Sequence, residues 1–350
     1  MTESVQPNRP YRVAQWATGT IGTCALRAII EHPKLALAGV LVHSQDKVGR
    51  DAGDLCGLTP TGVTSTGNID DIIELHADCV LYMPSTCDID EVCRLLAAGI
   101  NIVTTCGGFH HPAAMDPSVR ESVEKACEAG GASIHGTGSS PGFITEAVPL
   151  VVTSIQRRLD NLTIDEYADL SQRNSPELLF DLMGFGRSVG PFEEYRAAYL
   201  RSSFGPSLQL VAHAIGLPLD SIEAGGELAS TPRAADIAAG GLAAGSVAAQ
   251  RITISGMRDG KPLLRFRATW YCTTELEPDW DVHPTGWHLC VEGDAPLDID
   301  IRMPVPLDRM AAVSPGYTAN RAVNAVPYIC AASPGIQSTL DLPQIVAALG

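Results

Sequence analysis

A short glycine-rich segment near the N-terminus, Ala17-Thr18-Gly19-Thr20-Ile21-Gly22, has the residue types and spacing that bind a diphosphate. An apolar run precedes it and a helical pattern begins within it, which is the context that this fingerprint requires. Gly19 lets the backbone approach a pyrophosphate, and Gly22 lets the helix pack closely on the strand. The backbone N–H groups of Thr20, Ile21 and Gly22 then face the anion. The segment predicts a dinucleotide site, with alanine in place of the first glycine of the pattern.

The choice of dinucleotide depends on the end of the second predicted strand, where an Asp or Glu holds the ribose hydroxyls of NAD. This chain has His43 and Ser44 there, and Lys47 and Arg50 follow within reach of a 2′-phosphate. Lysine and arginine bind phosphate, whereas a carboxylate repels it. Asp46 is the counter-evidence, because it can accept a hydrogen bond from a ribose. We expect NADP(H) to be preferred and NAD(H) to be a possible second cofactor; the alternative is that Lys47 and Arg50 are solvated loop charges.

The nicotinamide is expected near three later segments, Pro84-Ser85, Thr105-Cys106 and Ser140-Pro141. Hydride transfer is chemistry of the cofactor, so the protein has to position the substrate, exclude water and donate a proton. Aromatic side chains are expected to supply an apolar substrate wall, with burial in the core as the alternative for each. These are Phe109, Trp270, Tyr271, Trp280 and Trp287.

Strands and helices alternate through the first part of the chain. Apolar runs predict strands at 12–17, 35–42, 79–83, 101–105 and 132–135, with helical patterns between them. This alternation is typical of a doubly wound parallel sheet with right-handed crossovers. We therefore predict a dinucleotide-binding Rossmann domain in residues 1–149.

The pattern changes after residue 149. Alternating runs predict several strands, including a hairpin around Asp259-Gly260, and helices are expected at 176–183, 192–215 and 320–331. We predict that residues 150–315 form an α+β domain with a mainly antiparallel sheet, used for substrate binding and dimerisation. Residues 316–350 are predicted to form a helical segment that returns to the Rossmann domain. The fold class is therefore α/β.

Composition and charge narrow the class of protein. The chain has 350 residues, of which 45% are hydrophobic and 18% charged, with a net charge of −16. This is a globular composition, and its charge argues against nucleic acid or an anionic membrane as a partner. No apolar run reaches the ~20 residues that span a bilayer, and Met1–Pro10 lacks the features of a signal peptide, so we expect a cytoplasmic protein. The ten cysteines include no C-x-x-C pair, which predicts reduced thiols and no metal site.

Longer motifs extend across most of the chain. They are Lys47–Gly53, Gly136–Gly138 leading to Ser140–Phe143, Ser175–Glu177 leading to Met183–Gly186, Glu275–Trp280 and Tyr317–Ala325. With these motifs the chain resembles the dihydrodipicolinate reductase-like Rossmann proteins, and among them the native amine dehydrogenase and 2,4-diaminopentanoate dehydrogenase family. The resemblance implies a homodimer that reversibly reduces a carbonyl with NAD(P)H, ammonia giving a primary amine. We also assign Asn324, in the last motif, to the cofactor.

The chain departs from that family at a catalytic carboxylate. In the family a glutamate after the strand at 101–105 binds the ammonium or imine nitrogen, and the resemblance puts Gly108 at its position. A carboxylate suits this role because it accepts a proton from ammonia and stabilises an iminium cation. Our candidates for the missing catalytic group are His110 and Glu146, each with a structural role as the alternative. Two glutamates beside Trp280 are further substitutes, Glu275 and Glu277.

Dihydrodipicolinate reductase itself carries a His-His pair followed by a lysine, placed after its Rossmann domain. The adjacent histidines here, His110 and His111, lie earlier in the chain, and no lysine follows them until Lys125. Adjacent residues of an extended chain also point to opposite sides. The sequence therefore argues against that enzyme's reaction.

Three functions remain open. The first is an NAD(P)H-dependent oxidoreductase of amine dehydrogenase ancestry, acting on the carbonyl or imine of a small, mostly apolar substrate. The second is an ammonium-independent keto or aldehyde reductase, which Gly108 favours. The third is a non-catalytic protein that binds NADPH as a sensor or assembles with a partner.

Overall fold

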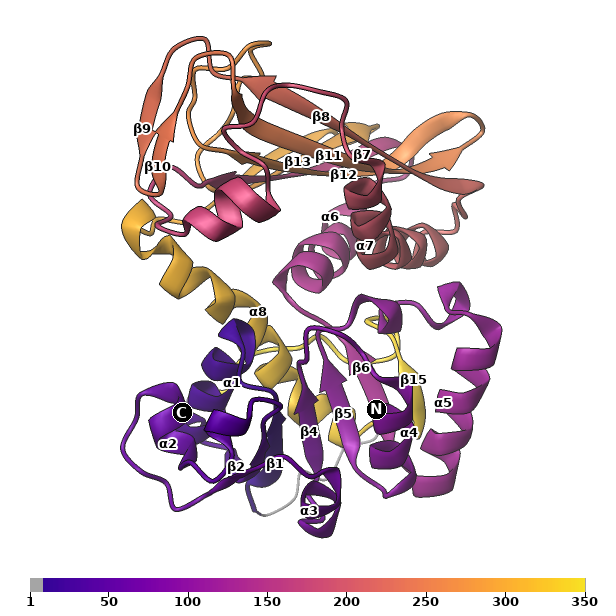
Figure 1. Cartoon of the computed structure of the whole chain (residues 1–350). Helices are drawn as coiled ribbons and strands as arrows, with labels where there is room; N and C mark the ends of the chain where they lie inside the picture. The colour runs from indigo at the N-terminus through magenta and orange to yellow at the C-terminus, as the bar shows by residue number, and fades with distance from the viewer. Residues whose placement is uncertain (1–8, 350) are drawn as a thin grey trace. The chain divides into compact units, whose positions relative to one another are not determined.

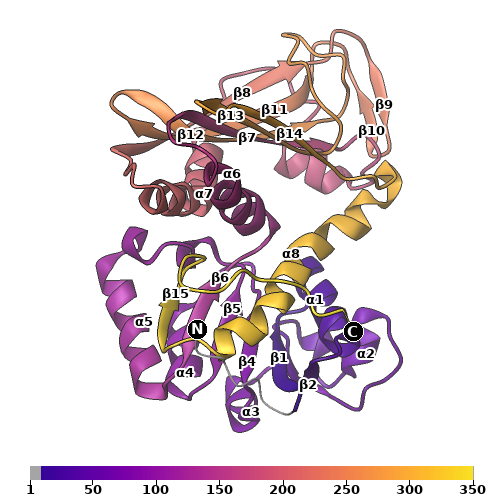
Figure 2. The same cartoon turned by 180° about the vertical axis from the view of Figure 1, so that it is seen from behind.

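The structure is a computed structural model that describes residues 9–349. The chain divides into two compact units. One consists of the residues up to Phe143 together with those from Ser314 onward, and the other is Ile144–Val313. Figures 1 and 2 show both from opposite sides. The second boundary falls inside helix α8 (Leu307–Cys330), so the chain re-enters the first unit within a helix.

A seven-stranded sheet forms the first unit, in the order β15-β6-β5-β4-β1-β2-β3, and each neighbouring pair is parallel. From β3 to β6 the order is 3-2-1-4-5-6, which is that of a doubly wound dinucleotide-binding sheet. The strands are β1 (Tyr11–Trp16), β2 (Leu35–Leu41), β3 (Ser65–Thr66), β4 (Cys79–Tyr82), β5 (Asn101–Thr104), β6 (Ser133–Gly136) and β15 (Gly335–Gln337). The helices, besides α8, are α1 (Thr20–Glu31), α2 (Ala52–Cys56), α3 (Ile69–Glu74), α4 (Ile89–Ala97) and α5 (Pro117–Gly130).

Both faces of this parallel sheet are buried. Ala14 and Val80 pack in one apolar cluster with residues of α3, α4 and α5. Their chain neighbours Val13 and Leu81 pack in a second cluster with residues of α1 and α8. Successive strand residues point to opposite faces, so a strand covered on both sides needs a continuous apolar run. The predicted Rossmann architecture is confirmed.

The second unit is built on a six-stranded sheet in the order β14-β13-β7-β12-β11-β8, in which β7 and β12 are parallel and the other pairs antiparallel. Helix α7 packs across β8, β11 and β12 (Figure 1), and its Phe204 stacks on Phe266 of β12 with ring centroids 4.1 Å apart. The predicted mainly antiparallel sheet is confirmed. Its strands are β7 (Leu159–Asp169), β8 (Ser221–Ser230), β11 (Val247–Arg258), β12 (Lys261–Tyr271), β13 (Gly286–Gly293) and β14 (Leu297–Arg302). The unit also contains a small sheet of β9 (Ala235–Ile237) and β10 (Gly240–Leu242), and the helices α6 (Val148–Thr153) and α7 (Glu194–Ala214).

The local patterns explain where the sequence predicted elements and where it did not. Asp259 and Gly260, with φ of 51° and 72°, form the predicted turn between β11 and β12, as a two-residue hairpin of this type requires. Strand β8 was not predicted because most of its side chains are exposed or half-buried and leave no apolar alternation. Helix α8 begins at Leu307, well before the predicted start at residue 320, because Pro315 interrupts the helical pattern that precedes it. Within residues 9–349, no helix has both the length and the apolar character needed to cross a bilayer.

Candidate functional site

Four connections of the first unit leave the parallel sheet at one edge. They follow the carboxyl ends of β1, β4, β5 and β6, and the register places Trp16 beside Tyr82, Tyr82 beside Thr104 and Thr104 beside Gly136. The order of the strands reverses between β1 and β4, which is where open α/β sheets bind their ligands. The predicted cofactor residues just beyond this edge include Gly19–Gly22, Pro84-Ser85, Thr105-Cys106 and Ser140-Pro141.

The glycine turn is defined by close contacts beneath it. A Cβ on Gly22 would lie 2.2 Å from the carbonyl oxygen of Ala17 and 3.1 Å from Gln15 Nε2, so the helix and strand approach closely enough to require glycine. Ala17 has a φ of 70°, and this left-handed conformation explains why glycine is usual at the first position of the fingerprint. The buried Gln15 side chain donates to the carbonyl oxygens of Trp16 and Ala17 at 3.1 and 2.9 Å. Gln15 was missed by sequence reasoning, although a glutamine inside an apolar run is a signal for it.

Helix α1 begins in this turn without a capping side chain. Gly19 is its exposed N-cap, a Cβ there would meet nothing within 4 Å, and no acidic residue lies in the first helical turn. An uncapped helix start leaves backbone N–H groups to bind an anion. In the same unit, α2, α3, α4 and α5 are capped by the side chains of Asp51, Asn68, Asp88 and Asp116.

The loop after β2 places Lys47 against the glycine turn. The Lys47 ammonium donates to the carbonyl oxygen of Thr18 at 2.9 Å and to its Oγ1 at 3.3 Å. Ser44 donates a hydrogen bond to Asp46, and this bond, with the charges of Lys47 and Arg50, lowers the pKa of the Asp46 carboxyl. The loop therefore holds the Lys47 ammonium against the glycine turn and keeps the nearby Asp46 side chain as a carboxylate. The other predicted residues are exposed in it, namely His43, Ser44 and Arg50.

Thr104 positions the loop after β5. Its buried hydroxyl donates to the carbonyl oxygen of Tyr82 at 2.8 Å and accepts from the amide of Cys106 at 3.1 Å. Hydrogen bonding with the Cys87 thiol and the charge of nearby His110 lower the pKa of the Cys106 thiol. The loop thus brings the predicted residues Cys106 and His110 together. Within residues 9–349, no three His, Cys, Asp or Glu side chains gather to hold a metal ion.

Gly108 and His110 differ in their surroundings. Gly108 is exposed, a Cβ on it would meet nothing within 4 Å, and its backbone lies outside the left-handed region. Packing therefore does not require glycine there. His110 is only 1% exposed and follows the helical turn Gly107–Phe109. A Cβ on Gly136 of β6 would lie 2.9 Å from Phe109 C and 3.2 Å from His110 N, so β6 fixes the position of the histidine.

The connection after β6 is tied to α8 within the first unit. The hydroxyls of Ser139 and Thr318 share a hydrogen bond of 2.7 Å. Asn324 is half-buried on α8. It directly follows Val323, which packs on the sheet. Ser140 and Pro141 are joined by a cis peptide bond and are half-buried. Of the segment after β4, Pro84 is half-buried and Ser85 exposed.

The carboxylates considered as catalytic groups belong to the second unit. Glu146 is fully buried and accepts a hydrogen bond of 2.5 Å from Ser207 of α7. Glu275 forms an ion pair with Arg233 at 2.6 and 2.9 Å, in which both side chains are more than half exposed. Glu277 pairs through its backbone with Ser230. The first unit therefore holds His110 and the predicted cofactor segments together, and these glutamates are not part of it.

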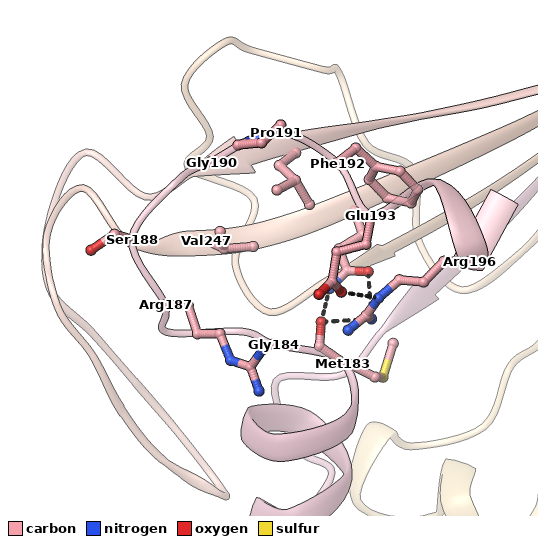
Figure 3. Close-up of a pocket in the computed structure, with 12 residues that line it drawn as sticks. Met183, Gly184, Arg187, Ser188, Gly190, Pro191, Phe192, Glu193, Arg196 and Val247 are labelled. Atoms are coloured by element: carbon pink, nitrogen blue, oxygen red, sulfur yellow. Dashed lines mark hydrogen bonds and ion pairs between the residues drawn. The ribbon is translucent and has the colours of Figure 1, made fainter.

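A small cavity of about 150 Å³ in the second unit is lined by nine residues of the segment between Met183 and Arg196 and by Leu228, Val247 and Gln250 (Figure 3). Arg196 donates to the carbonyl oxygens of Leu182 and Met183 at 2.7 and 3.0 Å and to Glu193 Oε2 at 2.7 Å. The hydrogen bond from Arg196 lowers the pKa of the Glu193 carboxyl. Since protein groups already engage this guanidinium, its role here is to hold the loop.

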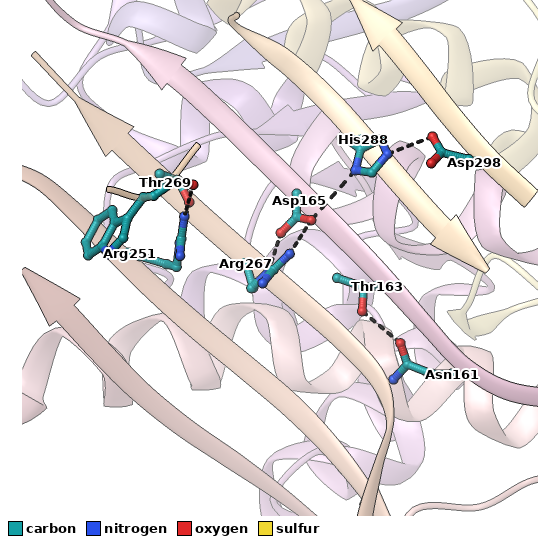
Figure 4. Close-up of polar contacts among 9 residues, drawn as sticks. Asn161, Thr163, Asp165, Arg251, Arg267, Thr269, His288 and Asp298 are labelled. Atoms are coloured by element: carbon teal, nitrogen blue, oxygen red, sulfur yellow. Dashed lines mark hydrogen bonds and ion pairs between the residues drawn. The ribbon is translucent and has the colours of Figure 1, made fainter. Parts of the chain in front are cut away.

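The other face of the second sheet carries a charged network (Figure 4). Phe266 faces α7, so its neighbour Arg267 points to the opposite side. Arg267 binds Asp165, whose side chain is 4% exposed, and His288 Nε2 lies 2.9 Å from Asp298 Oδ1. A hollow of about 670 Å³ on this face is lined by four cations and four carboxylates, namely Arg251, Lys261, Arg265 and Arg267 with Asp160, Asp165, Asp281 and Glu292.

Comparison with known proteins places the chain in a family. The model of the 2,4-diaminopentanoate dehydrogenase C-terminal domain matches residues 143–350, and that of the dihydrodipicolinate reductase N-terminus matches residues 16–129. An amine dehydrogenase from Streptomyces virginiae is 28% identical, covering 94% of this chain and 95% of its own. A 2,4-diaminopentanoate dehydrogenase from Acetoanaerobium sticklandii is 24% identical, covering 81% and 79%.

A solved structure shows the same fold. That of an amine dehydrogenase from Mycobacterium smegmatis matches with a TM-score of 0.76 at 19% identity, covering 98% of this chain and 99% of the other. The likeness extends through both units, as do the sequence matches. The chain therefore belongs to the amine dehydrogenase and 2,4-diaminopentanoate dehydrogenase family, with an N-terminal part of the dihydrodipicolinate reductase type, and is an NAD(P)-dependent dehydrogenase related to the amine dehydrogenases.

Proposed function

We propose that the protein transfers a hydride between NADP(H) and the carbonyl or imine carbon of a small, mostly apolar substrate. The observation that carries this proposal is the uncapped start of α1 at Gly19, with open space beside it, at the point where the strand order reverses. The nicotinamide supplies the hydride when it is bound. The residues of the chain bind the diphosphate at Gly19–Gly22 and orient the ring from the segments after β4, β5 and β6.

The preference for NADP(H) is proposed to come from Lys47. Its ammonium is anchored on Thr18 of the glycine turn, where it can meet a 2′-phosphate without a large loss of side-chain freedom. Lys47→Ala is expected to raise the KM for NADPH about tenfold, the effect of ~1.4 kcal/mol, and to leave the KM for NADH unchanged. Lys34→Ala, which removes an exposed lysine of the same unit, is the control. An unchanged KM for NADPH in Lys47→Ala would contradict the assignment of Lys47 to the 2′-phosphate.

We propose His110 as the group that donates a proton to the substrate oxygen or nitrogen. It lies beside Cys106 in the loop proposed to hold the nicotinamide, and β6 fixes its place. Imidazole is suited to this because it exchanges protons near neutral pH. Glu146 is the second candidate, and its buried bond to Ser207 favours a packing role. The variants His110→Gln and Glu146→Gln distinguish the two candidates. Replacing the proton donor should abolish turnover and leave NADPH binding intact, and we expect this result for His110→Gln.

The reaction is tested by following NADPH absorbance with a panel of ketones and aldehydes, with and without ammonium. We expect turnover that ammonium raises little, because Gly108 supplies no carboxylate to the amine nitrogen. The lack of a carboxylate at Gly108 favours a second function, that of a carbonyl reductase of amine dehydrogenase ancestry. Turnover that requires ammonium would instead show that another acid replaces the family glutamate. Tight NADPH binding with no turnover on any substrate would favour a sensor.

We propose that a second copy of the chain covers the charged face of the second sheet. Four cations and four carboxylates line its hollow, so two copies related by a twofold axis can place opposite charges together. Arg265 suits such a contact, because the residues level with it in the neighbouring strands are the uncharged Thr163 and Ser255. Arg265→Glu is expected to turn the dimer into a monomer in sedimentation equilibrium. Lys125→Glu on the exposed surface of α5 should leave the dimer intact, and a monomeric wild type would contradict the proposal.

A further inference from the structure

Gln15 is a polar side chain in a fully buried part of the first sheet. It lies on β1, two residues before Ala17, where the glycine turn begins, and it is 0% exposed. The residues level with it in the neighbouring strands are Val40 and Leu81, which are apolar and equally buried. Glutamine is mostly exposed in proteins, and a buried one is held by hydrogen bonds. Packing alone does not account for a glutamine at this position.

Two backbone oxygens fix the direction of the Gln15 amide. Its Nε2 donates to the carbonyl oxygen of Trp16 at 3.1 Å and to that of Ala17 at 2.9 Å. Both partners can only accept a hydrogen bond, so the nitrogen faces them and Oε1 faces away. Oε1 is buried and has no hydrogen-bond partner among the residues that the structure describes. An unpaired buried oxygen costs free energy of folding, and an apolar side chain of the same length, such as methionine, would avoid this cost.

The bond to Ala17 lies where the chain leaves β1 and enters the glycine turn. The amide of Ala17 still donates to the carbonyl oxygen of Leu41 at 2.9 Å, but its φ of 70° takes the chain out of the strand. A residue with a side chain adopts this left-handed conformation at a cost, which other interactions have to offset. The hydrogen bond from Gln15 holds the Ala17 carbonyl group in the orientation that this conformation gives it.

The same carbonyl group determines where α1 begins. A Cβ on Gly22 would lie 2.2 Å from the Ala17 oxygen and 3.1 Å from Gln15 Nε2, so the first turn of the helix packs directly on this hydrogen bond. Residues 18–21 connect the strand end to that contact. A displacement of the Ala17 carbonyl group would therefore move the backbone N–H groups that are proposed to bind the diphosphate.

We propose that Gln15 is a positioning residue of the diphosphate site, whose amide holds Ala17 in the conformation that presents the N–H groups of the glycine turn to the anion. This inference rests on the proposed function, in which the turn binds a dinucleotide. Gln15 is fully buried, so it acts through the backbone and not by contact with the ligand. Lys47, in contrast, is proposed to recognise only the extra phosphate of NADP(H). Loss of the Gln15 amide should consequently weaken the binding of NADPH and NADH equally, because both contain the diphosphate.

Gln15→Met tests the proposal, because methionine keeps the length of the side chain and removes the amide. In isothermal titration calorimetry we expect the Kd for NADPH and the Kd for NADH to rise by the same factor, about tenfold, the effect of losing one hydrogen bond. The control is Val13→Ala, on the same face of β1 and packed in the cluster with α1 and α8. It should lower the denaturation midpoint through lost packing and leave both Kd values unchanged.

Ala17→Gly provides a rescue that a packing role of Gln15 would not show. Glycine adopts a positive φ as readily as a negative one, so a turn that begins with glycine depends less on the Gln15 amide. In the Ala17→Gly chain we expect Gln15→Met to raise both Kd values by less than about threefold, and the difference between the two backgrounds measures the coupling of the two residues. Equal factors in both backgrounds, or a rise for NADPH alone, would overturn the proposal.

The titrations distinguish a failure of this proposal from a failure of the proposed function. Wild-type protein that binds both dinucleotides, with Kd values that Gln15→Met leaves unchanged, would overturn the role of Gln15 and leave the proposed function intact. Folded wild-type protein that binds neither dinucleotide would overturn the proposed function, and the role of Gln15 with it. The denaturation midpoint of each variant shows that it is folded at the temperature of the titration, and Gln15→Leu replaces Gln15→Met if the latter does not fold.

Discussion

Replacing Gly22 with alanine is expected to destabilise the protein by about 3 kcal/mol, the upper part of the usual range for overpacking. The new Cβ would lie 2.2 Å from the carbonyl oxygen and 3.0 Å from the carbonyl carbon of Ala17. These are backbone atoms on the strand side of the turn, and the buried amide of Gln15 holds the same oxygen at 2.9 Å. The carbonyl group of Ala17 cannot move away from the new Cβ without separating α1 from β1. The free energy of unfolding, measured with a chemical denaturant, checks this directly.

Gly19→Ala is the matched variant, because its Cβ would meet nothing within 4 Å. We expect its free energy of unfolding to stay within ~0.5 kcal/mol of wild type, as for other open positions. Its affinity for NADPH should nevertheless fall by about tenfold or more, since the added methyl group occupies the approach of the diphosphate to the backbone. The two variants therefore distinguish the packing role of Gly22 from the proposed diphosphate-binding role of Gly19. Equal loss of stability in both, or full NADPH affinity in Gly19→Ala, would contradict the proposed geometry.

Gly108→Glu is expected to raise the ammonium-dependent kcat/KM about 100-fold, which is the lower range for a positioned acid or base. The position is exposed, has open space for a side chain and needs no left-handed backbone. A glutamate there would restore the carboxylate that the family resemblance places after β5. It would accept a proton from ammonia and stabilise the iminium cation that hydride attacks.

Gly108→Gln is the control for this gain, since it adds the same bulk without the charge. We expect it to leave the ammonium-dependent rate at the wild-type level and to have a similar free energy of unfolding. The alignment that puts the family glutamate at Gly108 would be rejected if both variants behaved alike. It would also be rejected if Gly108→Glu raised only the rate without ammonium.

The fold of the first unit was accessible from sequence because its strands are covered on both faces. Val13 and Ala14 are neighbours that enter different cores, and only a continuous apolar run satisfies both. The glycine turn was visible for a related reason, since Gly22 is required by a local backbone contact. The boundaries between the two units were harder to predict from the sequence. We predicted changes after residues 149 and 315, and the compact units change after residues 143 and 313, because both structural boundaries fall in or beside helical segments that no composition shift marks.

The residues that position the site were harder to predict. Thr104 acts by bonding Tyr82, 22 residues earlier in the chain, and the two residues meet because β4 and β5 pair. Such contacts depend on strand order and register, which apolar periodicity does not specify. Sequence reasoning selected Lys47 as a cofactor residue, but it could not foresee the bonds of Lys47 to Thr18 in the glycine turn. Glu146 was selected because it follows Phe143 on the helix expected to open at Pro141, whereas its buried bond to Ser207 depends on the packing of α7.

The central claim is that the uncapped start of α1 at Gly19–Gly22 binds the diphosphate of a nicotinamide dinucleotide, with Lys47 beside the extra phosphate. Isothermal titration calorimetry of the purified chain with NADPH and then with NADH tests it most directly. The account predicts saturable binding of NADPH, weaker binding of NADH, and a loss of this difference in Lys47→Ala. No measurable binding of either dinucleotide by folded wild-type protein would contradict it.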